Sequence, residues 1–312
     1  MDLPRKIQLT GRNTFIVSLP HEWVEKRGVA KGDAVYLNEN EDGTLTFSLK
    51  PAERAQKTCV IEVSPGATET SMRNIVSAYV SGAGKIVLRG KGMSTVAEEA
   101  RRILSGVEIS EETENELELS ILAFDDLDVD SIIKRAFNVT NSMFNLATVM
   151  YRDGSDVLVE ISRKEDEVDR LYLLVLRNFG MGKDPKNQVF KAIAAKSIEK
   201  VSDHLEDICS SGKGVYPNKL IGGLLDRSAG VYSAAYDAFS KNEVDKGAFS
   251  DAKTQYLSDF EKVDETLKKE KNASRMLTLR SLCEKCNKVL RYSEDIMESG
   301  TDIVFADMEG RR

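Results

Sequence analysis

Residues 198–208 read Ile198-Glu199-Lys200-Val201-Ser202-Asp203-His204-Leu205-Glu206-Asp207-Ile208. In an α-helix the carboxylates of Glu199, Asp203 and Asp207 recur every four residues and form a ladder along one face. The apolar residues of the run fall on the opposite side: Ile198, Val201, Leu205 and Ile208. The run therefore predicts an amphipathic helix with a buried apolar stripe and a column of oxygen ligands that faces outward.

The carboxylate ladder allows several explanations. Like charges four residues apart repel one another by about 0.2–0.5 kcal/mol, so packing behind the helix, a cation in front of it or a basic partner must hold them together. A hard divalent or trivalent metal ion suits such an all-oxygen site. A solvated acidic face is the commoner explanation of a charged stripe. The run alone leaves these alternatives open.

The composition is that of a globular, soluble chain with more than one domain. A chain of 312 residues is longer than one hydrophobic core usually serves, so two or three domains are expected. Hydrophobic residues make up 41% and charged residues 30%, and no apolar run approaches the roughly 20 residues of a membrane helix. Four cysteines and the absence of an apolar leader favour a cytoplasmic location.

Side chains for catalysis are scarce. Only two histidines occur, His21 and His204, which makes histidine-based catalysis and zinc sites poor candidates. No combination of nucleophile and base suggests an enzyme. We therefore expect a protein that is not an enzyme and holds no organic cofactor.

The first 50 residues alternate short strands with glycine-containing turns. Four strands and one helix are expected, over residues 5–9, 15–19, 34–38, 44–49 and, for the helix, 21–27. So small a unit cannot bury a sufficient core alone, and we expect an obligate dimer. Residues 1–31 hold six basic against three acidic side chains, whereas the whole chain has a net charge of −7. Nucleic acid is the first candidate for an anionic partner.

The order of these elements resembles the AbrB/SpoVT/MazE family of swapped-hairpin DNA-binding domains. The resemblance covers residues 5–50 and is carried by Leu19-Pro20, Trp23 and Gly28-Val29-Ala30-Lys31-Gly32-Asp33. It implies a two-chain β-barrel over residues 1–50 whose first strand and turn approach double-stranded DNA. Carried onto this sequence, it implies five DNA contacts: Arg5, Lys6, Arg12, Lys26 and Arg27. Ordinary solubilising charge is the alternative explanation of each residue taken singly.

After a linker near residues 50–56, residues 57–127 predict a small α/β connector domain. Its strands and helices are expected over residues 59–63, 69–80, 85–89, 95–104 and 116–124. A strand, helix and parallel strand in this order form a βαβ unit. Turns at residues 64–68 and 89–95 could hold an anion at a helix N-terminus, but neither has the spacing of a phosphate-binding motif.

From Val129 onward the sequence predicts helices only. Six are expected, over residues 129–151, 155–179, 186–211, 217–241, 244–271 and 273–299. Three helices followed by three more indicate an internal duplication, with repeats 129–212 and 217–300 inside a domain of residues 129–305. The repeats are expected to pack as a pair of three-helix bundles.

The 198–208 run ends the first repeat and is similar to the Glu-Arg-Ile-x-Asp signature of PhoU, the phosphate-uptake regulator. The resemblance covers roughly residues 129–300 and implies a metal ion held on carboxylates, with Fe, Mg, Mn and Zn as alternatives. It assigns five candidate ligands: Glu199, Asp203, Asp207, Glu165 and Asp169. In the second repeat Asn287, Arg291 and Asp295 occupy the equivalent positions. Because a guanidinium cannot ligate a cation, we expect a metal in the first repeat only.

The predicted fold class is multidomain α+β: a dimeric N-terminal swapped-hairpin β-barrel, a small α/β connector and a C-terminal all-α, PhoU-like pair of three-helix bundles. The expected function is a cytoplasmic, homodimeric, DNA-binding regulator of phosphate uptake and homeostasis. The alternative is an adaptor that regulates a phosphate-transporter ATPase or a signalling partner by protein contact and uses the barrel only to dimerise. A toxin-neutralising antitoxin is a third alternative, which the large helical domain disfavours.

Overall fold

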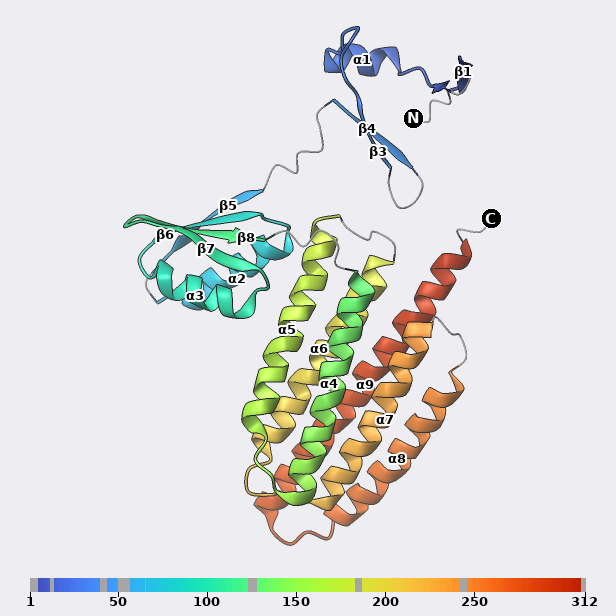
Figure 1. Cartoon of the computed structure of the whole chain (residues 1–312). Helices are drawn as coiled ribbons and strands as arrows, with labels where there is room; N and C mark the ends of the chain where they lie inside the picture. Colours follow the sequence, from blue (N-terminus) through green and yellow to red (C-terminus); the bar gives the residue numbers. More distant parts are fainter. Residues whose placement is uncertain are drawn as a thin grey trace. The chain divides into compact units, whose positions relative to one another are not determined.

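A computed structural model describes residues 5–11, 14–39, 44–49, 57–64, 66–122, 128–182, 187–241 and 246–309. The chain divides into two compact units, Met1–Ala55 and Gln56–Arg312 (Figure 1). In its described part the first unit holds two hairpins and a short helix. The second unit holds a four-stranded sheet with two helices, followed by six long helices. The predicted connector and helical domains therefore belong to one compact unit.

The N-terminal unit has the predicted order of strands and helix. β1 (Gln8–Thr10) pairs antiparallel with β2 (Thr14–Ile16), and β3 (Tyr36–Glu39) pairs antiparallel with β4 (Leu45–Ser48). Helix α1 (His21–Arg27) ends at Gly28, whose φ of 64° is the left-handed conformation that glycine favours. The two hairpins form separate two-stranded sheets, so the described residues of this single chain close no barrel.

This unit has no hydrophobic core of its own. None of its described residues is buried, and the side chains of Leu9, Phe15 and Leu37 are 61%, 72% and 61% exposed. Burial of apolar surface contributes about 25 cal/mol per Å² to stability, and small hairpins without such burial are marginal in water. The unit therefore needs a second surface to cover its apolar side chains.

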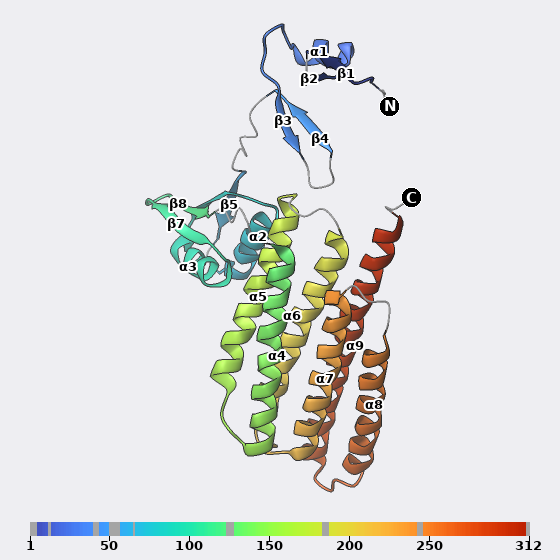
Figure 2. The ribbon, with the colours of Figure 1, turned by 45° about the vertical axis from the view of Figure 1, so that its right-hand side comes forward.

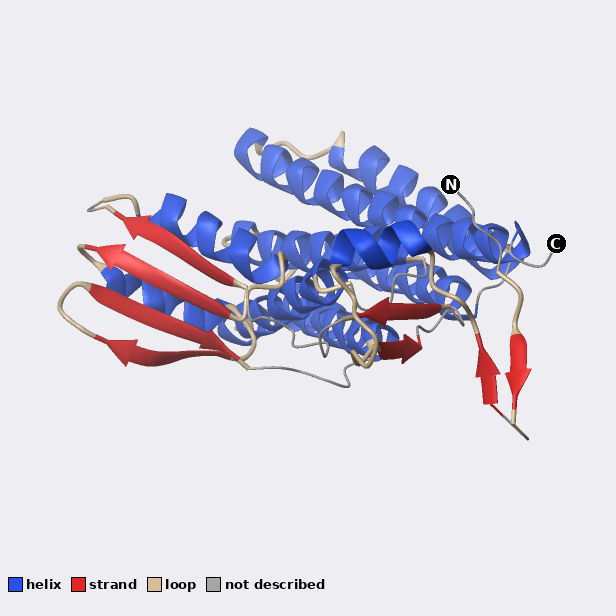
Figure 3. Cartoon of the chain, turned by 90° about the horizontal axis from the view of Figure 1, so that it is seen from above, coloured by secondary structure: helices blue, strands red, loops and turns tan. Residues whose placement is uncertain are grey.

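The second unit begins with an α/β region that contains the predicted βαβ element. β5 (Thr58–Val63) runs parallel to β6 (Lys85–Gly90), and helix α2 (Thr68–Val80) connects them. After helix α3 (Met93–Ile103), β7 (Val107–Glu112) and β8 (Glu116–Ile121) form an antiparallel hairpin. The order of the sheet is β5-β6-β8-β7. Figure 3 shows the strands of this sheet side by side in red.

The sequence did not predict β7. Of its six residues only Val107 is buried, and most of the others are exposed. An edge strand that buries one side chain has no alternation of apolar and polar residues. The inner strands β6 and β8 do alternate, and they bury Ile86, Leu88, Leu117 and Leu119 against the helices of this region.

The six predicted long helices are confirmed. They are α4 (Val129–Asp153), α5 (Leu158–Gly180), α6 (Gln188–Ser211), α7 (Lys219–Lys241), α8 (Gly247–Leu267) and α9 (Ala273–Glu309). Helix α9 continues ten residues beyond its predicted end at residue 299. It passes through Gly300, where a Cβ atom would lie 2.5 Å from the Cα of Phe239. The glycine thus allows close approach of α7 and α9 instead of ending the helix.

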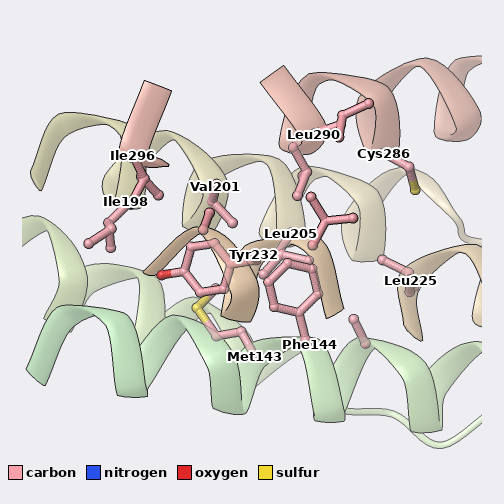
Figure 4. Packing of buried hydrophobic residues seen from close by; sticks show 14 of the residues in the cluster. Met143, Phe144, Ile198, Val201, Leu205, Leu225, Tyr232, Cys286, Leu290 and Ile296 are labelled. Atoms are coloured by element: carbon pink, nitrogen blue, oxygen red, sulfur yellow. The ribbon is translucent and has the colours of Figure 1, made fainter. Parts of the chain in front are cut away.

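The predicted repeats comprise helices α4–α6 and α7–α9, which we call the two helix groups; the duplication itself stays a prediction. Helix α6 packs along α9 and α4 packs along α7 (Figure 2). The two groups share one hydrophobic core, in which Val201 and Leu205 of α6 meet Tyr232 of α7 and Leu290 of α9 (Figure 4). Among the described residues, no helix combines the length and the apolar character that crossing a membrane requires.

Helix α5 also contacts the α/β region. Its end lies so close to α2 that a Cβ atom on Gly180 would be 1.8 Å from the carbonyl oxygen of Val80. Arg102 of α3 forms an ion pair of 2.9 Å with Asp166 of α5. The α/β region is therefore joined to the helical bundle through α5.

Asp128 is the N-cap residue of helix α4, and its substitution tests how much the cap contributes to stability. The Asp128 carboxylate accepts hydrogen bonds from the backbone N–H of Ser131 at 3.0 Å and from its hydroxyl at 2.7 Å. The hydrogen bond from Ser131 lowers the pKa of Asp128. We expect Asp128→Ala to reduce the free energy of unfolding by about 1 kcal/mol at pH 7, as measured by urea denaturation.

The pH dependence of this effect has a definite sign. Because the folded-state pKa of Asp128 lies below its ordinary value, its contribution is present at neutral pH and is lost as the pH falls through the folded-state pKa. The difference between Asp128→Ala and the wild type should shrink on acidification. The control Asp128→Asn keeps an acceptor oxygen and should lose only a few tenths of that energy. A difference that grows toward acidic pH would contradict this role for Asp128.

Candidate metal centre and nucleic-acid surface

Helix α6 has the predicted apolar stripe, but its carboxylates do not form a straight outward column. The four apolar residues of the stripe are fully buried: Ile198, Val201, Leu205 and Ile208. Glu199 is also buried, at 7% exposure, so the prediction of an outward-facing carboxylate is wrong there. With 3.6 residues per turn, each step of four residues turns the side chain by about 40°. Asp207 is therefore rotated by about 80° from Glu199.

Three of the five predicted ligands come together between α5 and α6. Glu165 and Asp169 of α5 and Asp203 of α6 each offer an oxygen atom, and these oxygens lie within 4.8 Å of one another. The Oδ1 atom of Asp169 is buried and has no hydrogen-bond partner. An oxygen-binding metal ion takes ligands of this kind, and a buried oxygen without a partner is costly unless a proton or a cation satisfies it. We call these three residues the carboxylate cluster.

Two lysines of α6 lie beside the cluster. Lys196 Nζ is 2.8 Å from Glu199 Oε2, and Lys200 Nζ is 3.4 Å from Glu199 Oε1 and 2.5 Å from Asp203 Oδ2. Burial lowers the pKa of Lys200, but its hydrogen bond to Asp203 and the charge of Glu199 outweigh this and raise it overall. Glu199 is thus engaged by ammonium groups, and Asp203 is shared with one. A metal ion bound here would have to displace Lys200 from Asp203.

Sequence reasoning missed this role of the lysines, although a signal was present. Lys196 precedes Glu199 by three residues and Lys200 precedes Asp203 by three. Residues three apart on a helix are neighbours on its surface, where opposite charges pair. The spacing therefore predicts internal ion pairs as readily as it predicts metal ligands.

The two carboxyl groups of α5, Glu165 and Asp169, have pKa values above their ordinary values. Burial, with the nearby charge of Asp169 as the next cause, raises the pKa of Glu165 to about 8. Burial and the charge of Glu199 raise the pKa of Asp169 to about 6. At neutral pH the metal-free cluster therefore retains a proton on Glu165, whereas Asp169 is largely ionised, and a metal ion bound through Glu165 would have to displace that proton.

Asp207 lies apart from the carboxylate cluster. Its Oδ1 atom accepts hydrogen bonds from Lys285 Nζ and from Ser211 Oγ, both at 2.9 Å. Lys285 belongs to α9, so Asp207 connects the two helix groups. His204, three residues earlier, lies with its ring 5.6 Å from that of Tyr292 on α9. Neither side chain contributes to the cluster.

The second repeat holds an ion-pair network at the corresponding place. Asp264 of α8, the counterpart of Asp169, is 3.1 Å from Lys268 and 3.7 Å from Arg280. Phe260 stands where Glu165 stands in the first repeat. The two halves of the bundle therefore differ in chemistry although their helices correspond.

A cavity of about 830 Å³ opens at one end of the bundle. Phe137 and Tyr236 stack within it, with ring centroids 3.8 Å apart. Its charged lining residues are Asp128, Asp130, Asp237, Asp307, Lys134 and Lys191. Four carboxylates against two lysines make this cavity an unfavourable site for free phosphate.

The predicted DNA contacts lie on the exposed surface of the N-terminal unit. Arg5 and Lys6 precede β1, and Lys26 and Arg27 form the last turn of α1. All four residues are exposed, and no ion pair within the described part of the chain engages them. Arg12 lies outside the described residues. The four described cations are therefore available to an anionic partner.

Comparison with family models identifies two parts of the chain. A model of the PhoU domain matches residues 133–211, which contain the carboxylate cluster and end with α6. A model described as antidote-toxin recognition MazE, bacterial antitoxin, matches residues 8–52, which contain both hairpins and α1. Searches of curated proteins and of solved structures gave no match. The chain therefore joins a MazE-type domain at its N-terminus to a PhoU domain, which is the fusion that the sequence motifs predicted.

Proposed function

We propose that this protein is a DNA-binding transcriptional regulator of phosphate uptake and homeostasis. A MazE-type domain and a PhoU domain in one chain fit a role in phosphate regulation. The observation that carries the proposal is the N-terminal unit, which exposes Arg5, Lys6, Lys26 and Arg27 and buries none of its described side chains. The chain acts in the cytoplasm as a regulator and catalyses no reaction.

Dimerisation supplies the missing core of the N-terminal unit. The exposed apolar side chains of both hairpins, among them Phe15 and Leu37, become buried when two copies interleave their hairpins into one barrel. In such a homodimer the basic residues of both copies act together on the DNA. Lysines and arginines that neutralise phosphates supply most of the affinity, and Arg12, which follows β1 in the sequence, reads a groove.

The PhoU domain is the sensor. A divalent or trivalent metal ion on Glu165, Asp169 and Asp203 would supply the positive charge that these carboxylates lack, and it would link α5 to α6. Because α5 also contacts α2 and α3, a change at the cluster bears on the α/β region that leads to the N-terminal unit. DNA affinity then responds to the state of the sensor if one state favours the DNA-competent dimer.

The second candidate function is an adaptor. Most of the chain belongs to Gln56–Arg312, outside the DNA-binding unit, and a PhoU domain could act on a phosphate-transporter ATPase or a signalling protein by direct contact. In that case the N-terminal unit serves only dimerisation. DNA binding distinguishes the two functions.

Titration with DNA from upstream of phosphate-transport genes, at several salt concentrations, tests the proposal. We expect saturable, sequence-preferring binding that weakens steeply with salt. In the double variant Lys26→Ala/Arg27→Ala, the slope of log affinity against log salt should fall by about 1 for each phosphate contact removed. Fluorescence anisotropy of labelled DNA measures both quantities.

The matched control is Lys213→Ala/Lys219→Ala, which removes the same charge from exposed positions of the helical bundle. It should leave the salt slope unchanged. An equal loss in both variants would mean that net charge alone governs binding. No binding by the wild type, with or without metal or phosphate, would favour the adaptor.

A further inference from the structure

Helix α9 carries its charges in two separate halves. It is the longest helix among the described residues and runs along the whole bundle (Figure 1). Residues 273–291 hold five basic side chains and one acidic side chain, whereas residues 292–308 hold five acidic side chains and no basic one. The helix dipole favours the reverse order, with acidic residues near the start and basic residues near the end. The stability of the helix therefore does not explain this segregation of charge.

The exposed residues of α9 form one narrow stripe. From residue 281 to residue 305 the exposed positions recur in alternating steps of three and four, and the residues between them are buried or half-buried. The stripe begins at Ser281 and ends at Phe305, and its four central members are Lys288, Arg291, Asp295 and Glu298. A spacing that averages 3.5 residues keeps a stripe facing a partner helix along its whole length. The stripe therefore suits contact with another long helix.

The four central charges of the stripe have no ion-pair partner within the described part of the chain. The neighbouring Lys285 and Glu294 do form ion pairs, with α6 and α8 respectively. Even Arg291 and Asp295, which stand four residues apart on the same face, form no ion pair with each other. Like charges three residues apart also repel one another within each half of the stripe. These exposed charges are therefore available to groups of opposite sign on a partner.

A second copy of α9 in antiparallel orientation presents the complementary charges. When the reversed stripe is centred on Ser293, its steps of three and four coincide with those of the original stripe. In this register Lys288 faces Glu298 of the second copy, and Arg291 faces Asp295. Sliding one helix by seven residues in either direction, to the next register in which the steps coincide, sets central residues of like charge opposite each other. Charge therefore selects the register centred on Ser293.

The two-fold symmetry of this register doubles each contact. It yields four ion pairs, against two contacts of like charge in which Glu284 faces Asp302. Exposed ion pairs are individually weak, so four of them do not hold free chains together at micromolar concentration. Two chains that already form a homodimer meet at an effective concentration of millimolar order. Weak contacts between long helices are sufficient there.

Exposed apolar side chains at both ends of α9 add to the contact. Leu277, Phe305 and Met308 are 63%, 56% and 54% exposed. In the register centred on Ser293, Phe305 and Met308 of one copy reach the turn that holds Leu277 in the second copy. Removal of this apolar surface from water favours the pairing at each end.

We propose that α9 pairs antiparallel with α9 of a second copy of this chain, with Lys288 opposite Glu298 and Arg291 opposite Asp295. A partner of uniform charge would satisfy one half of the stripe and be repelled by the other half. A second copy satisfies both halves, because the reversed α9 carries the opposite order of charges. This pairing rests on the homodimer of the proposed function and is independent of DNA binding.

Charge swaps in the full chain test the pairing. Lys288→Glu/Arg291→Glu makes the centre of the stripe acidic throughout, and Asp295→Lys/Glu298→Lys makes it basic throughout. Each double variant should lose the pairing, because its four central contacts become repulsive. The quadruple variant that combines all four changes should regain it, since its stripe is again acidic in one half and basic in the other. A partner of another kind would not be recovered by this combination.

The distance between spin labels on two copies reports the pairing. In a Cys59→Ser background the remaining native cysteines are buried, so Ala306→Cys supplies an accessible thiol on an exposed residue beside the stripe. Pairing centred on Ser293 separates the two labels by about 39 Å along the helix axis. Pulsed electron paramagnetic resonance should detect this distance with the native stripe and in the quadruple variant. Its population should fall at least about tenfold in either double variant.

The matched control is Lys213→Glu/Lys219→Glu, which reverses two charges at exposed positions outside α9 and should keep the distance. A distance that persists in both double variants, or that the quadruple variant does not regain, would overturn the pairing. Its absence from a chain with the native stripe that sediments as a dimer would refute the pairing alone. A monomeric chain would refute both the pairing and the proposed homodimer.

Discussion

Replacing Glu165 by Gln together with Asp169 by Asn should stabilise the metal-free protein at pH 7.5 by about 2 kcal/mol. Burial and neighbouring carboxylates raise the pKa of Glu165 to about 8 and that of Asp169 to about 6. The folded chain consequently binds more protons than the unfolded chain between the ordinary and the raised pKa values. The free energy of unfolding of the wild type should fall as the pH rises through this window. That of the double variant, whose amides do not ionise, should not show this fall.

The same double variant should lose its response to metal ions. A metal ion that binds only the folded state stabilises it by about 2.7 kcal/mol at a concentration of 100 Kd, and the variant lacks two of the three ligands. Urea denaturation across pH 4–8, with and without Mg, Mn, Fe or Zn, measures both effects. Elemental analysis of the purified wild type and of Asp203→Ala tests the third ligand.

Glu160→Gln on the exposed first turn of α5 is the control for the loss of a carboxylate. It should change the stability by less than about 0.5 kcal/mol and leave the metal response intact. A double variant that is less stable than the wild type at pH 7.5 would show that the carboxylates support the fold. An equal metal content in the wild type and Asp203→Ala would remove this cluster as the metal site.

Local sequence patterns predicted most of the elements because each pattern has a local cause. The apolar stripe of residues 198–208 follows from the helical repeat, and α1 lies between Pro20 and Gly28, which favour the start and the end of a helix. The β7 strand escaped prediction because it buries only Val107. Where one side chain carries the burial, no periodic pattern exists to be recognised.

The candidate centre could be predicted only in part. The spacing of four residues located Asp203, the resemblance to PhoU added Glu165 and Asp169, and the structure brings the oxygens of these three residues together. It could not show that Asp207 turns toward Lys285 of α9, since that depends on how two helices far apart in sequence pack. Partners of this kind are a property of the tertiary structure.

Sequence patterns also did not predict the contact between α5 and the α/β region. Asp166, Arg170, Leu173 and Arg177 recur at the spacing of one helix face. Arg102 pairs with Asp166, and its backbone carbonyl accepts a hydrogen bond from Arg170. Leu173 packs against the core of the α/β region. Because Glu165 and Asp169 occupy the adjacent face of α5, this helix connects the carboxylate cluster with the α/β region.

Arg177→Ala should destabilise the second unit by about 3 kcal/mol, the largest loss that we expect from a single substitution in this contact. The side chain of Arg177 is 4% exposed, and its Nη1 atom donates a hydrogen bond of 2.7 Å to the carbonyl oxygen of Tyr79. Its guanidinium also lies 4.7 Å from the centre of the Tyr79 ring, a cation–π contact worth about 2 kcal/mol when it is shielded from water. Truncation removes both interactions and leaves a void. Urea denaturation and the amide exchange of α2 measure the loss.

Two further variants separate the contributions of packing, charge and hydrogen bonding to the expected loss of stability. Arg177→Met keeps most of the volume without the charge, so it should recover the packing part of the loss and leave α2 exchanging faster than in the wild type. Arg170→Ala removes a single 3.2 Å hydrogen bond at a partly exposed position of the same face and should cost less than about 1 kcal/mol. If the state of the carboxylate cluster reaches the N-terminal unit through α5, a metal-dependent change in DNA affinity should survive Arg170→Ala and be lost in Arg177→Ala. A response that persists unchanged in Arg177→Ala would mean that the coupling does not pass through the contact between Arg177 and Tyr79.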